Sequence, residues 1–439
     1  MRVETVIIGS GISGLSLAHF MSKKDKSFIV IEAESKVGGI IQTKKNRDFI
    51  CEFGPNTVLL NNEAIIELIK DCDLWDELIY PSKKSDKNRY VIHNGKLVAV
   101  PTSIGSFLFS PILSVRAKLR LFFEPFIPKS AKNLSVYDFI KNRFGKEFHD
   151  KLIEPFLTGI YAGNTKKMSA KHVLKKLWTL EQDYGSVLNG FFRRKSSKVK
   201  SLPTSFSFPN GLAQLTSSIE KNIKENVIFN TTVKNVEKDG DEYIVRCNSQ
   251  NFTCKNVIST IPSYALKEII TKKSLKDELE SIIYSPITVF HFAFQKKNIR
   301  NSLEGFGVLT KPSDKKNFLG VLFNTQIFNH VSPEDKELFT VLVGGERQRE
   351  LCDLDIDDLQ EKVLADLEDL IDHSGDLMLN ECYKWNYGIP QYGMRQDMLS
   401  QEIYSFEKEN KGFYILGNFF NGVSVSDCVM NAKKLSDLI

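Results

Sequence analysis

Apolar residues near the start of the chain change from a strand-like run to a helical spacing and back. Val3–Ile8 is rich in β-forming residues and ends at Gly9, and Phe28–Ile31 is a second run of this kind. Between them, residues 12–22 carry apolar side chains at the spacing expected of a helix. A strand, a glycine turn, a helix and a strand within about 30 residues predict a βαβ unit.

The interior of the chain alternates between helical and strand-like patterns. Residues 115–188 have helical character, with Asn133 or Ser135 as a cap for one helix. The β-rich stretch at 226–247 contains Asp239-Gly240, which predicts a hairpin.

Shorter runs complete the pattern towards the C-terminus. The predicted strands lie at 256–262, 306–309, 318–323, 339–343 and 412–420, and the three between 306 and 343 are expected to share one sheet. Helices are predicted at 355–372 and 426–439. A βαβ start, a mixed interior and a return to α/β at the end predict one domain assembled from both termini, with others inserted into it.

Composition adds mainly exclusions. Hydrophobic residues make up 42% and charged residues 26%, and the net charge of +5 is too small by itself to indicate a nucleic-acid partner. The seven cysteines form no C-x-x-C pair and the seven histidines are dispersed, so we expect reduced thiols in a cytoplasmic compartment and no bound metal. We expect neither a signal peptide nor a membrane-spanning helix, because no apolar run reaches 18 residues.

The first candidate for chemistry is the glycine triplet after the first predicted strand. Gly9 permits a tight turn, Gly11 offers no side chain that would obstruct a pyrophosphate, and Gly14 permits close packing of the helix. Glu32 follows the second strand, where its carboxylate can accept hydrogen bonds from both ribose hydroxyls. Its charge also disfavours a 2′-phosphate, so the pattern predicts a dinucleotide other than NADP.

FAD and NAD share this kind of cradle. Gly38-Gly39 follows Glu32, and the C-terminal segment at 415–432 supplies another strand, glycine loop and helix start. A second helix N-terminus can stabilise negative charge on a reduced flavin, whereas a nicotinamide enzyme has no need of this distant site. The distribution of motifs therefore favours FAD.

Taken in order, these motifs resemble the amine-oxidase-like FAD flavoproteins. The shared segments are the glycine triplet, Glu32, Gly38-Gly39, "FGPN" (53–56), "PNGLAQL" (209–215), "STIP" (259–262) and "GVSVSDC" (422–428). Within that superfamily the chain resembles the oxygen-dependent, FAD-containing protoporphyrinogen oxidases over nearly its whole length. That narrower likeness rests on "NRYVIHNGKLVAVP" (88–101), "EPFLTGIYAGN" (154–164), "GFGVL" (305–309), "IPQY" (389–392) and "GVSVSDC".

The resemblance implies an α/β plus α+β fold with three domains. A Rossmann-type FAD-binding domain built from both termini would comprise residues 1–80, 203–262 and 380–439. An inserted mixed-sheet, substrate-binding domain would comprise 81–100 and 263–379, and a helical, membrane-facing domain 101–202.

The resemblance also implies a set of FAD contacts. These are Gly9, Ser10, Gly11, Ile12, Ser13 and Gly14 at the pyrophosphate, Glu32 and Ala33 at the ribose, Val233 at the adenine, Gly39, Ile40, Gly54, Pro55, Asn56 and Thr57 on the flavin side, and Val423, Ser424 and Val425 below the flavin. Ile40 stands where many superfamily members have arginine, a position at which the protoporphyrinogen oxidases vary.

Substrate contacts are implied in the same way. Arg89 would meet a propionate of the porphyrinogen, although an arginine beside a strand is ordinarily a surface residue. Gly159 would let the macrocycle approach the backbone, and Asn56 would orient the substrate near the flavin. Phe306, Val308 and Leu342 would enclose the pyrrole rings, although apolar strand residues are ordinarily core.

The activity implied is the six-electron oxidation of protoporphyrinogen IX to protoporphyrin IX in haem synthesis, with O2 as acceptor. No catalytic side chain is assigned, because hydride transfer to flavin N5 depends mainly on orientation. Three alternatives remain: coproporphyrinogen III oxidation by the same family, a related amine oxidase or carotene desaturase, and a flavin-bound scaffold without turnover.

Two segments predict a membrane surface as a partner. Residues 110–129 mix Arg116, Lys118 and Arg120 with leucines and phenylalanines, and residues 193–200 hold five positive charges and no negative one. The alternative is an amphipathic core helix and a solvated loop. The resemblance favours a cytoplasmic, peripherally bound protein, with a homodimer and hand-over of product to a chelatase as further expectations; no nucleic-acid partner is expected.

Overall fold

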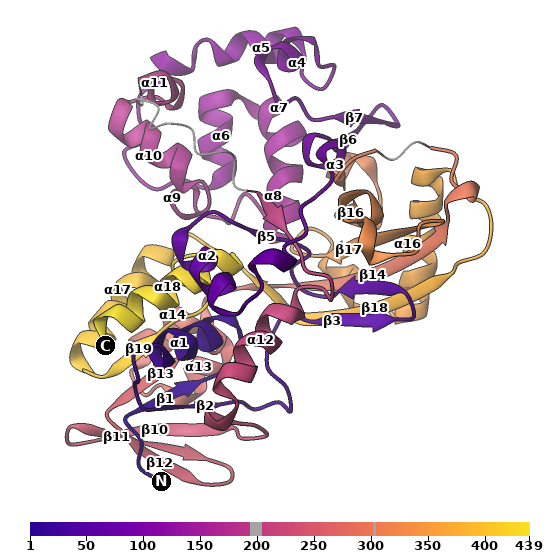
Figure 1. Cartoon of the computed structure of the whole chain (residues 1–439). Helices are drawn as coiled ribbons and strands as arrows, with labels where there is room; N and C mark the ends of the chain where they lie inside the picture. The colour runs from indigo at the N-terminus through magenta and orange to yellow at the C-terminus, as the bar shows by residue number, and fades with distance from the viewer. Residues whose placement is uncertain (194–203, 302–303) are drawn as a thin grey trace.

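A five-stranded parallel sheet draws its strands from distant parts of the chain (Figure 1). This computed structural model describes residues 1–193, 204–301 and 304–439. The strands, in order across the sheet, are β19 (Phe413–Ile415), β13 (Asn256–Ser259), β1 (Thr5–Ile8), β2 (Phe28–Ile31) and β9 (Val227–Ile228). The two ends of the chain therefore contribute to one sheet.

The two faces of this sheet are covered by different elements because alternate residues of β1 point to opposite sides. Ile7 packs in a core with α1 (Ile12–Ser22), α2 (Glu63–Asp71), α12 (Ala213–Ile223) and α18 (Val425–Leu438). Val6 and Ile8 pack in a second core, on the other face. This second core includes β10 (Val233–Asp239), β11 (Glu242–Cys247), β12 (Asn251–Cys254), α13 (Ser263–Ile269), α14 (Lys273–Glu280) and α17 (Gln396–Glu409).

A mixed seven-stranded sheet forms the second region, drawn mainly in orange in Figure 1. Helix α16 (Ile356–Ile371) buries its apolar stripe on one face of this sheet. In order across the sheet, the strands are β18 (Leu379–Pro390), β14 (Tyr284–Gln295), β17 (Lys336–Gly344), β16 (Gly320–Phe323), β15 (Gly307–Leu309), β6 (Arg89–His93) and β7 (Lys96–Ala99). Only β15 and β6 run parallel among the pairs in the described residues.

Two short strand pairs lie between the large sheets. Strands β3 (Thr43–Asn46) and β4 (Phe49–Glu52) form a hairpin, and β5 (Val58–Leu59) pairs with β8 (Ser205–Phe206). Phe49, Cys51 and Phe53 pack against the face of the seven-stranded sheet opposite α16. Short helices α3 (Lys83–Lys87) and α15 (Asn324–Ile327) flank this region.

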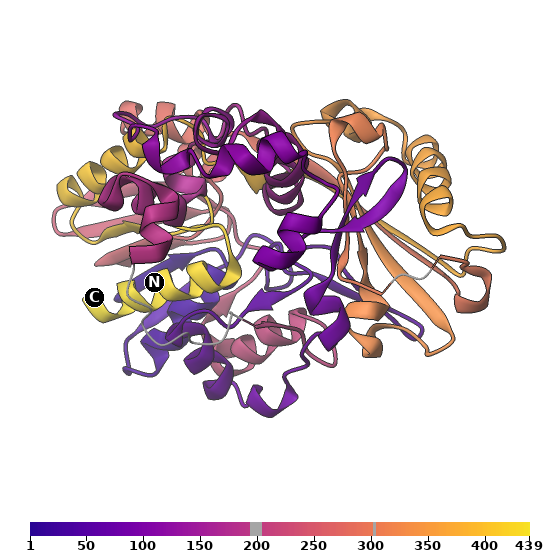
Figure 2. The same cartoon turned by 90° about the horizontal axis from the view of Figure 1, so that it is seen from above.

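A helical region lies at the top of Figure 1, above the five-stranded sheet and beside the β6–β7 end of the seven-stranded sheet, and Figure 2 shows it from above. Its elements are α4 (Ile104–Phe109), α5 (Val115–Leu121), a 3-10 turn (Glu124–Phe126), α6 (Val136–Phe144), α7 (Lys146–Phe148), a π-helical turn (His149–Ile153), α8 (Glu154–Tyr161), α9 (Ala170–Val173), α10 (Lys175–Tyr184) and α11 (Val187–Arg193). Ser135 is the N-cap of α6 and accepts a hydrogen bond from Asp138 N. No helix in the described part of the chain is long and apolar enough to cross a bilayer.

Most elements predicted from sequence patterns are confirmed. Helix α1 and strand β2 have the predicted bounds, and Asp239-Gly240 turns between β10 and β11. The strand predicted at 412–420 is shorter in the structure, where β19 ends at Ile415. Gly417, two residues later, adopts φ +152°, which takes the backbone out of the strand conformation. The fold is a mixed α/β arrangement with mixed sheets, as expected.

Two segments differ from the predicted domain boundaries. Strand β18 begins at Leu379 and pairs with β14, so residues 379–390 belong to the seven-stranded sheet rather than to the predicted FAD-binding segment that begins at 380. Helices α13 and α14 pack in the core of the five-stranded sheet, although the predicted substrate domain begins at 263. Both differences arise because the chain crosses between the sheets through long β strands and helices that carry no local boundary signal. The other boundaries stay predictions.

Candidate functional site

The turn from β1 into α1 uses its glycines in three different ways. Gly9 adopts φ +99° and donates its N–H to the carbonyl of Ile31 at 2.8 Å. A Cβ on Gly14 would lie 2.0 Å from the carbonyl oxygen of Gly9, so only glycine permits this close approach. A Cβ on Gly11 would meet no atom within 4 Å, so the space beside Gly11 is open to a ligand.

The N-terminus of α1 is suited to an anion. Gly11 is its N-cap, no side chain caps it, and its first turn, with Ile12 and Ser13, contains no acidic residue. The N–H groups of that turn are therefore available to phosphate oxygens. Gly39 lies against this turn, since its Cβ would be 3.3 Å from Gly11 Cα, and the neighbouring Gly38 donates to Ser10 O at 2.9 Å.

Glu32 lies beside the same turn. Its Oε2 accepts hydrogen bonds from the backbone N–H and the hydroxyl of Ser10, and its Oε1 accepts from Glu34 N at 3.0 Å. A carboxylate offers about four acceptor positions, so these bonds leave one position on Oε1 for a ribose hydroxyl. Ala33 is exposed next to it, and the segment leading to Val233 is held nearby by the bond from Thr231 N to Glu32 O at 2.8 Å.

The first turn of α18 meets the segment after β4. Ser424 caps α18 and accepts from Asp427 N at 3.1 Å. Ser426 donates to Leu59 O at 2.6 Å, and Asn62 Nδ2 donates to Ser426 O at 3.0 Å. These hydrogen bonds bring the two segments that precede them, residues 54–57 and 423–425, into one region of the molecule.

These flavin-side residues are open to solvent to different degrees. A Cβ on Gly54 would lie 1.9 Å from Ile40 O, so Gly54 and Ile40 are in backbone contact. Gly39 and Ile40 are exposed. The half-buried positions are Gly54, Pro55, Asn56, Thr57, Val423, Ser424 and Val425.

Asn56 lies against α15 and strand β17 of the seven-stranded sheet, a contact that no local pattern in the sequence indicates. Its Oδ1 lies 3.4 Å from Asn324 Nδ2 and 3.3 Å from the hydroxyl of Thr340. That hydroxyl lies 3.1 Å from His291 Nδ1, and His291 Nε2 lies 3.0 Å from Glu52 O. Burial lowers the pKa of His291 to about 4, so its ring is neutral near pH 7. The neutral ring donates from Nε2 to Glu52 O and accepts at Nδ1 from Thr340.

Arg89 of β6 and Phe306, which directly precedes β15, come together. The guanidinium of Arg89 lies 4.7 Å from the centroid of the Phe306 ring, and Arg89 pairs with Gly307 across β6 and β15. Phe306 and Leu342 are partly buried on the sheet face that also packs against Phe49 and Phe53. Two of the residues expected to contact the substrate, Arg89 and Phe306, therefore form a cation–π pair.

Val308 does not share that face. It is 1% exposed and packs among the residues that α16 covers. Phe306 precedes β15, and Gly307 at φ +153° interrupts the alternation between Phe306 and Val308. Val308 lies in register with Val321 and Val341, whereas Leu342, the neighbour of Val341, points to the other side of the sheet. The expectation that all three residues enclose the same rings does not fit this arrangement.

Gly159 of α8 faces Leu309, the residue that follows Val308 on β15. A Cβ on Gly159 would lie 2.5 Å from Leu309 Cδ2, so the glycine makes room for Leu309. Leu309 was not among the sequence candidates. The alternation of β15 could have indicated it, because Leu309 points away from the side chain of Val308.

Comparison with known proteins assigns the family. The sequence pattern of the flavin-containing amine oxidoreductases matches residues 12–439. The chain belongs to the flavin-containing amine oxidoreductase family. It is therefore an oxidoreductase, and FAD is its cofactor.

Individual relatives of this flavoprotein cover nearly its whole length. It is 30% identical to protoporphyrinogen oxidase 2 of Arabidopsis thaliana, over 99% of this chain and 93% of that one. It is 26% identical to coproporphyrinogen III oxidase of Bacillus subtilis (strain 168), over 98% and 97% of the two chains. A crystal structure from Exiguobacterium sp. 255-15, provisionally assigned as a protoporphyrinogen oxidase, has the same fold, with a TM-score of 0.84, 22% identity and coverage of 100% and 98%.

The geometry of the flavoprotein fits FAD at the dinucleotide end. The open side of Gly11 is the space that a Cβ would fill, and it adjoins the uncapped N-terminus of α1. Residues of that turn would hold the pyrophosphate, and Glu32 would hold the ribose. The first turn of α18 and residues 54–57 would contact the flavin side.

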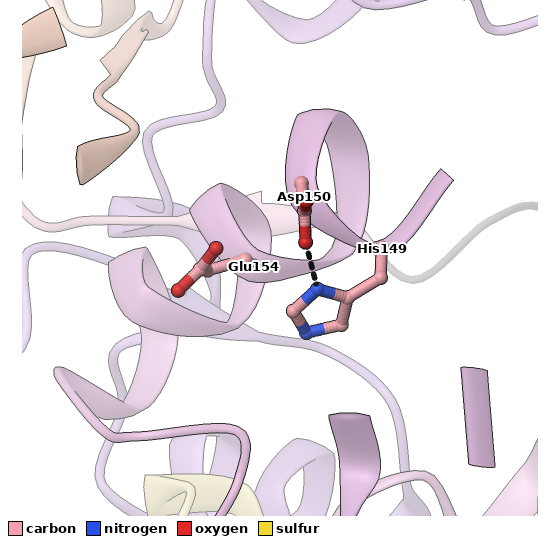
Figure 3. A group of neighbouring side chains, drawn as sticks. All are labelled: His149, Asp150 and Glu154. Carbon is pink, nitrogen blue, oxygen red and sulfur yellow. Dashed lines mark hydrogen bonds and ion pairs between the residues drawn. The ribbon is translucent and has the colours of Figure 1, made fainter. Parts of the chain in front are cut away.

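One side-chain group in the described residues has ligand atoms spaced closely enough for a metal (Figure 3). His149 and Asp150 of the π-helical turn and Glu154 at the start of α8 place these atoms within 4.8 Å of one another. His149 Nδ1 lies 2.8 Å from Asp150 Oδ1, and its Nε2 lies 2.9 Å from Thr165 Oγ1. Both ring nitrogens are thus engaged in hydrogen bonds that hold the imidazole in place.

Proposed function

We propose that this flavoprotein oxidises a porphyrinogen to the porphyrin with O2 as electron acceptor, and that protoporphyrinogen IX is its substrate. The observation that carries the proposal is 30% identity to a protoporphyrinogen oxidase along almost the full length of both chains. The stacked Arg89 and Phe306 support it, because together they offer a cation for a propionate and an aromatic surface for a pyrrole.

The reaction requires the protein mainly to position the porphyrinogen against the flavin. FAD would supply the two-electron acceptor for a hydride equivalent from a methylene bridge carbon, with O2 as the final acceptor. Three such rounds would remove six electrons and six hydrogens in all, one from each of the four methylene bridges and two from pyrrole N–H groups, and would convert three O2 to three H2O2. Phe306 and Leu342 would hold the rings against an apolar wall, and Arg89 would fix the rotation of the macrocycle through a carboxylate.

Asn56 would act as a polar orienting group at the flavin side. Its Oδ1 accepts from Asn324 Nδ2, so its Nδ2 group is left to face the ligands. Gly159 would act through Leu309, whose side chain it accommodates. No side chain is assigned as a proton acceptor.

Anaerobic mixing of the holoenzyme with protoporphyrinogen IX tests the proposal. We expect bleaching of the oxidised flavin absorbance and the appearance of fluorescent porphyrin, followed by peroxide when air is admitted. Flavin that stays oxidised would overturn the porphyrinogen assignment. Reduction by a polyamine or a polyene alone would indicate an amine oxidase or a carotene desaturase, and bound FAD without turnover of any of them would indicate a scaffold.

Coproporphyrinogen III is the second candidate substrate. The likeness to the Bacillus subtilis enzyme, at 26% identity over nearly complete chains, favours this alternative. The two substrates differ at two ring positions, where a vinyl group replaces a propionate. The ratio of kcat/KM for the two porphyrinogens decides between them, and a ratio in favour of coproporphyrinogen would replace the proposed substrate.

The role of Arg89 gives a direct test of the substrate side. Loss of a charge-assisted hydrogen bond costs about 1.5–3 kcal/mol, so we expect Arg89→Ala to raise KM about 10- to 100-fold and to leave FAD content unchanged. Lys96→Ala, which removes an exposed cation from the neighbouring β7, is the control and should alter neither quantity. A loss of FAD from Arg89→Ala would indicate a structural role instead.

A membrane surface is proposed as a partner. Around α5, large apolar side chains are exposed to solvent, with Phe109 90% and Phe126 83% exposed. Residues 194–200 of the second basic segment lie outside the described residues. We expect peripheral binding on the cytoplasmic side; a homodimer and hand-over of product to a chelatase stay predictions, and sedimentation equilibrium of the holoenzyme tests the dimer.

A further inference from the structure

A basic cleft opens on the helical region, away from the residues of the flavin site. It has a volume of about 960 Å³ and is bounded by α5, the segment 127–134, and the adjoining ends of α6 and α7. Its lining includes six cationic side chains on the protein surface and no carboxylate: Arg116, Arg120, Lys129, Lys132, Lys141 and Lys146. A concave surface lined by one sign of charge attracts counter-ions.

Buried ion pairs fix one wall of this basic cleft. Arg143 is fully buried and pairs with Glu124 and Glu181, both buried. It also donates to Ile127 O at 2.9 Å and to Pro128 O at 3.1 Å. Glu181 in turn accepts from the backbone N–H and the hydroxyl of Ser130. The backbone on which Lys129 stands is therefore held from both sides, so the cleft is built into the fold.

The opposite wall of the cleft is also held in place, and most of the positive charges in the whole lining are not neutralised by an acidic side chain. Arg120 donates to Asn142 O at 2.9 Å, and its side chain lies against Gly145. Lys146 is paired with Asp150. Arg116, Arg120, Lys129, Lys132 and Lys141 form no ion pair with any acidic side chain whose position the structure describes. Five positive charges thus face a cleft that has no acidic partner in its lining.

An apolar ridge runs beside the basic cleft on the same helix. It consists of Val115, Leu119, Phe122, Phe123 and Phe126, all of which are exposed. The spacing of these residues places them along one side of α5 and the turn that follows it. Arg116 and Arg120 stand next to ridge residues in the sequence and line the cleft. An apolar ridge at the rim of a cationic cleft matches the boundary between acyl chains and headgroups.

We propose that the basic cleft binds the phosphate group of an anionic phospholipid. The inference rests on the membrane surface in the proposed function and adds a specific headgroup site to it. Guanidinium and ammonium groups are the side chains that proteins use to hold phosphate oxygens. The apolar ridge favours a lipid over a soluble phosphate ester, because its side chains can enter the bilayer while the cleft takes the headgroup.

Vesicle co-sedimentation of the holoenzyme tests the basic cleft. The vesicles are phosphatidylcholine alone, or phosphatidylcholine and phosphatidylglycerol at a ratio of about 3:1, which gives the membrane surface a moderate negative charge. We expect Lys129→Gln/Lys132→Gln to lower partition onto the anionic vesicles about 30-fold, or about fivefold for each lost charge. Lys234→Gln/Lys238→Gln on β10 removes the same charge far from the helical region and should change nothing.

Two other variants and measurements separate the possible failures. Phe122→Ser/Phe126→Ser should weaken binding to both kinds of vesicle, and porphyrinogen oxidation in detergent should stay unchanged in the cleft and ridge variants. Anionic partition of the cleft variant equal to that of the β10 control would overturn the cleft proposal alone. Failure of the unaltered protein to bind either vesicle would overturn both the cleft and the membrane surface, and leave the oxidase proposal intact.

The source of the phosphate is decided by competition at constant ionic strength. For a lipid site, replacing chloride by inorganic phosphate should leave the preference for anionic vesicles in place. If inorganic phosphate abolished that preference and raised the Tm of the holoenzyme, but not that of Lys129→Gln/Lys132→Gln, the ligand would be a free phosphate and the lipid assignment would be wrong.

Discussion

At the scale of single residues, neighbouring glycines of one motif have separate physical roles. Gly14 is required by the chain itself, because a side chain there would collide with the carbonyl of Gly9. Gly11 has no such constraint, since its backbone lies at φ −67° and the space beside it is open. The motif therefore combines a folding requirement with a ligand requirement, and substitution by alanine can separate them.

We expect Gly14→Ala to lower the free energy of unfolding of the apoprotein by about 1–3 kcal/mol through overpacking. Gly11→Ala should leave that free energy within about 1 kcal/mol of its original value, because its φ suits alanine. It should nevertheless weaken FAD binding at least about tenfold, since the methyl group would enter the space of the pyrophosphate. Urea unfolding of the apoproteins and fluorescence titration with FAD measure the two effects. Equal FAD affinity in Gly11→Ala and the original protein would contradict the cradle.

At the scale of elements, the contact between α8 and β15 shows how a helix packs closely against an interior strand of the seven-stranded sheet. Gly159 has no side chain, and Leu309 occupies the space that one would need. The close approach of helix to strand thus depends on a pair of residues of which only the glycine was a sequence candidate. If Gly159 contacts the substrate directly, or if it only makes room for Leu309, different effects on stability and KM are expected when Gly159 and Leu309 are both changed.

We expect Gly159→Ala to destabilise the protein by about 1–3 kcal/mol, because its Cβ would collide with Leu309 Cδ2. Leu309→Ala should remove the collision, so the double variant should lose less stability than the two single variants summed, by about 0.5–3 kcal/mol. Thermal unfolding of all four proteins completes the cycle. Strict additivity would show that the pair does not interact, and a KM raised only by the glycine substitution would assign Gly159 to the substrate.

At the scale of the whole molecule, Glu52 joins regions that are far apart in the chain. Its carboxylate accepts from Leu212 N at 2.6 Å, just before α12, and from Thr43 of β3. Its backbone oxygen lies 3.0 Å from His291 Nε2 in the seven-stranded sheet. Burial raises the pKa of Glu52 to about 7 and lowers that of His291 to about 4. The two shifts have opposite consequences for stability.

The raised pKa of Glu52 means that the folded state keeps a proton that the unfolded state releases above pH 4.5, so stability falls as pH rises from there to about 7. The lowered pKa of His291 means that the unfolded state binds a proton below pH 6.5 that the folded state does not, so stability falls as pH falls to about 4. These slopes oppose each other wherever they overlap, and together they predict a nearly flat profile from about pH 4.5 to 6.5.

Single substitutions should expose each slope. His291→Asn should make the protein less stable as pH rises from 4.5 to 7, by about 1.4 kcal/mol per pH unit. Glu52→Gln should make it less stable as pH falls from 6.5 to 4, by a similar amount. Urea titrations across this pH range measure both, and Glu334→Gln, at an exposed position, is the control. Profiles parallel to the original in both variants would contradict the opposing slopes.

The sequence by itself determined the local part of this protein. The bounds of α1 and β2, the turn at Asp239-Gly240 and the cap at Ser135, one of two candidates, follow from backbone freedom, alternation and side-chain hydrogen bonds within a few residues. The dinucleotide end of the site belongs to this class, because its glycines and Glu32 lie within one βαβ unit. Resemblance in the order of motifs along the chain added the family.

Tertiary structure alone decided the rest. Val308 and Leu309 are adjacent apolar residues, and only the positions of α16 and α8 determine which face each one covers. Asn56 is held by residues more than 260 positions away, a contact that leaves no local spacing in the sequence. The basic cleft likewise needs the buried Arg143 pairs to hold its wall in place. Local patterns report which residues can form an element, whereas the partners across a sheet or a cleft depend on how those elements pack.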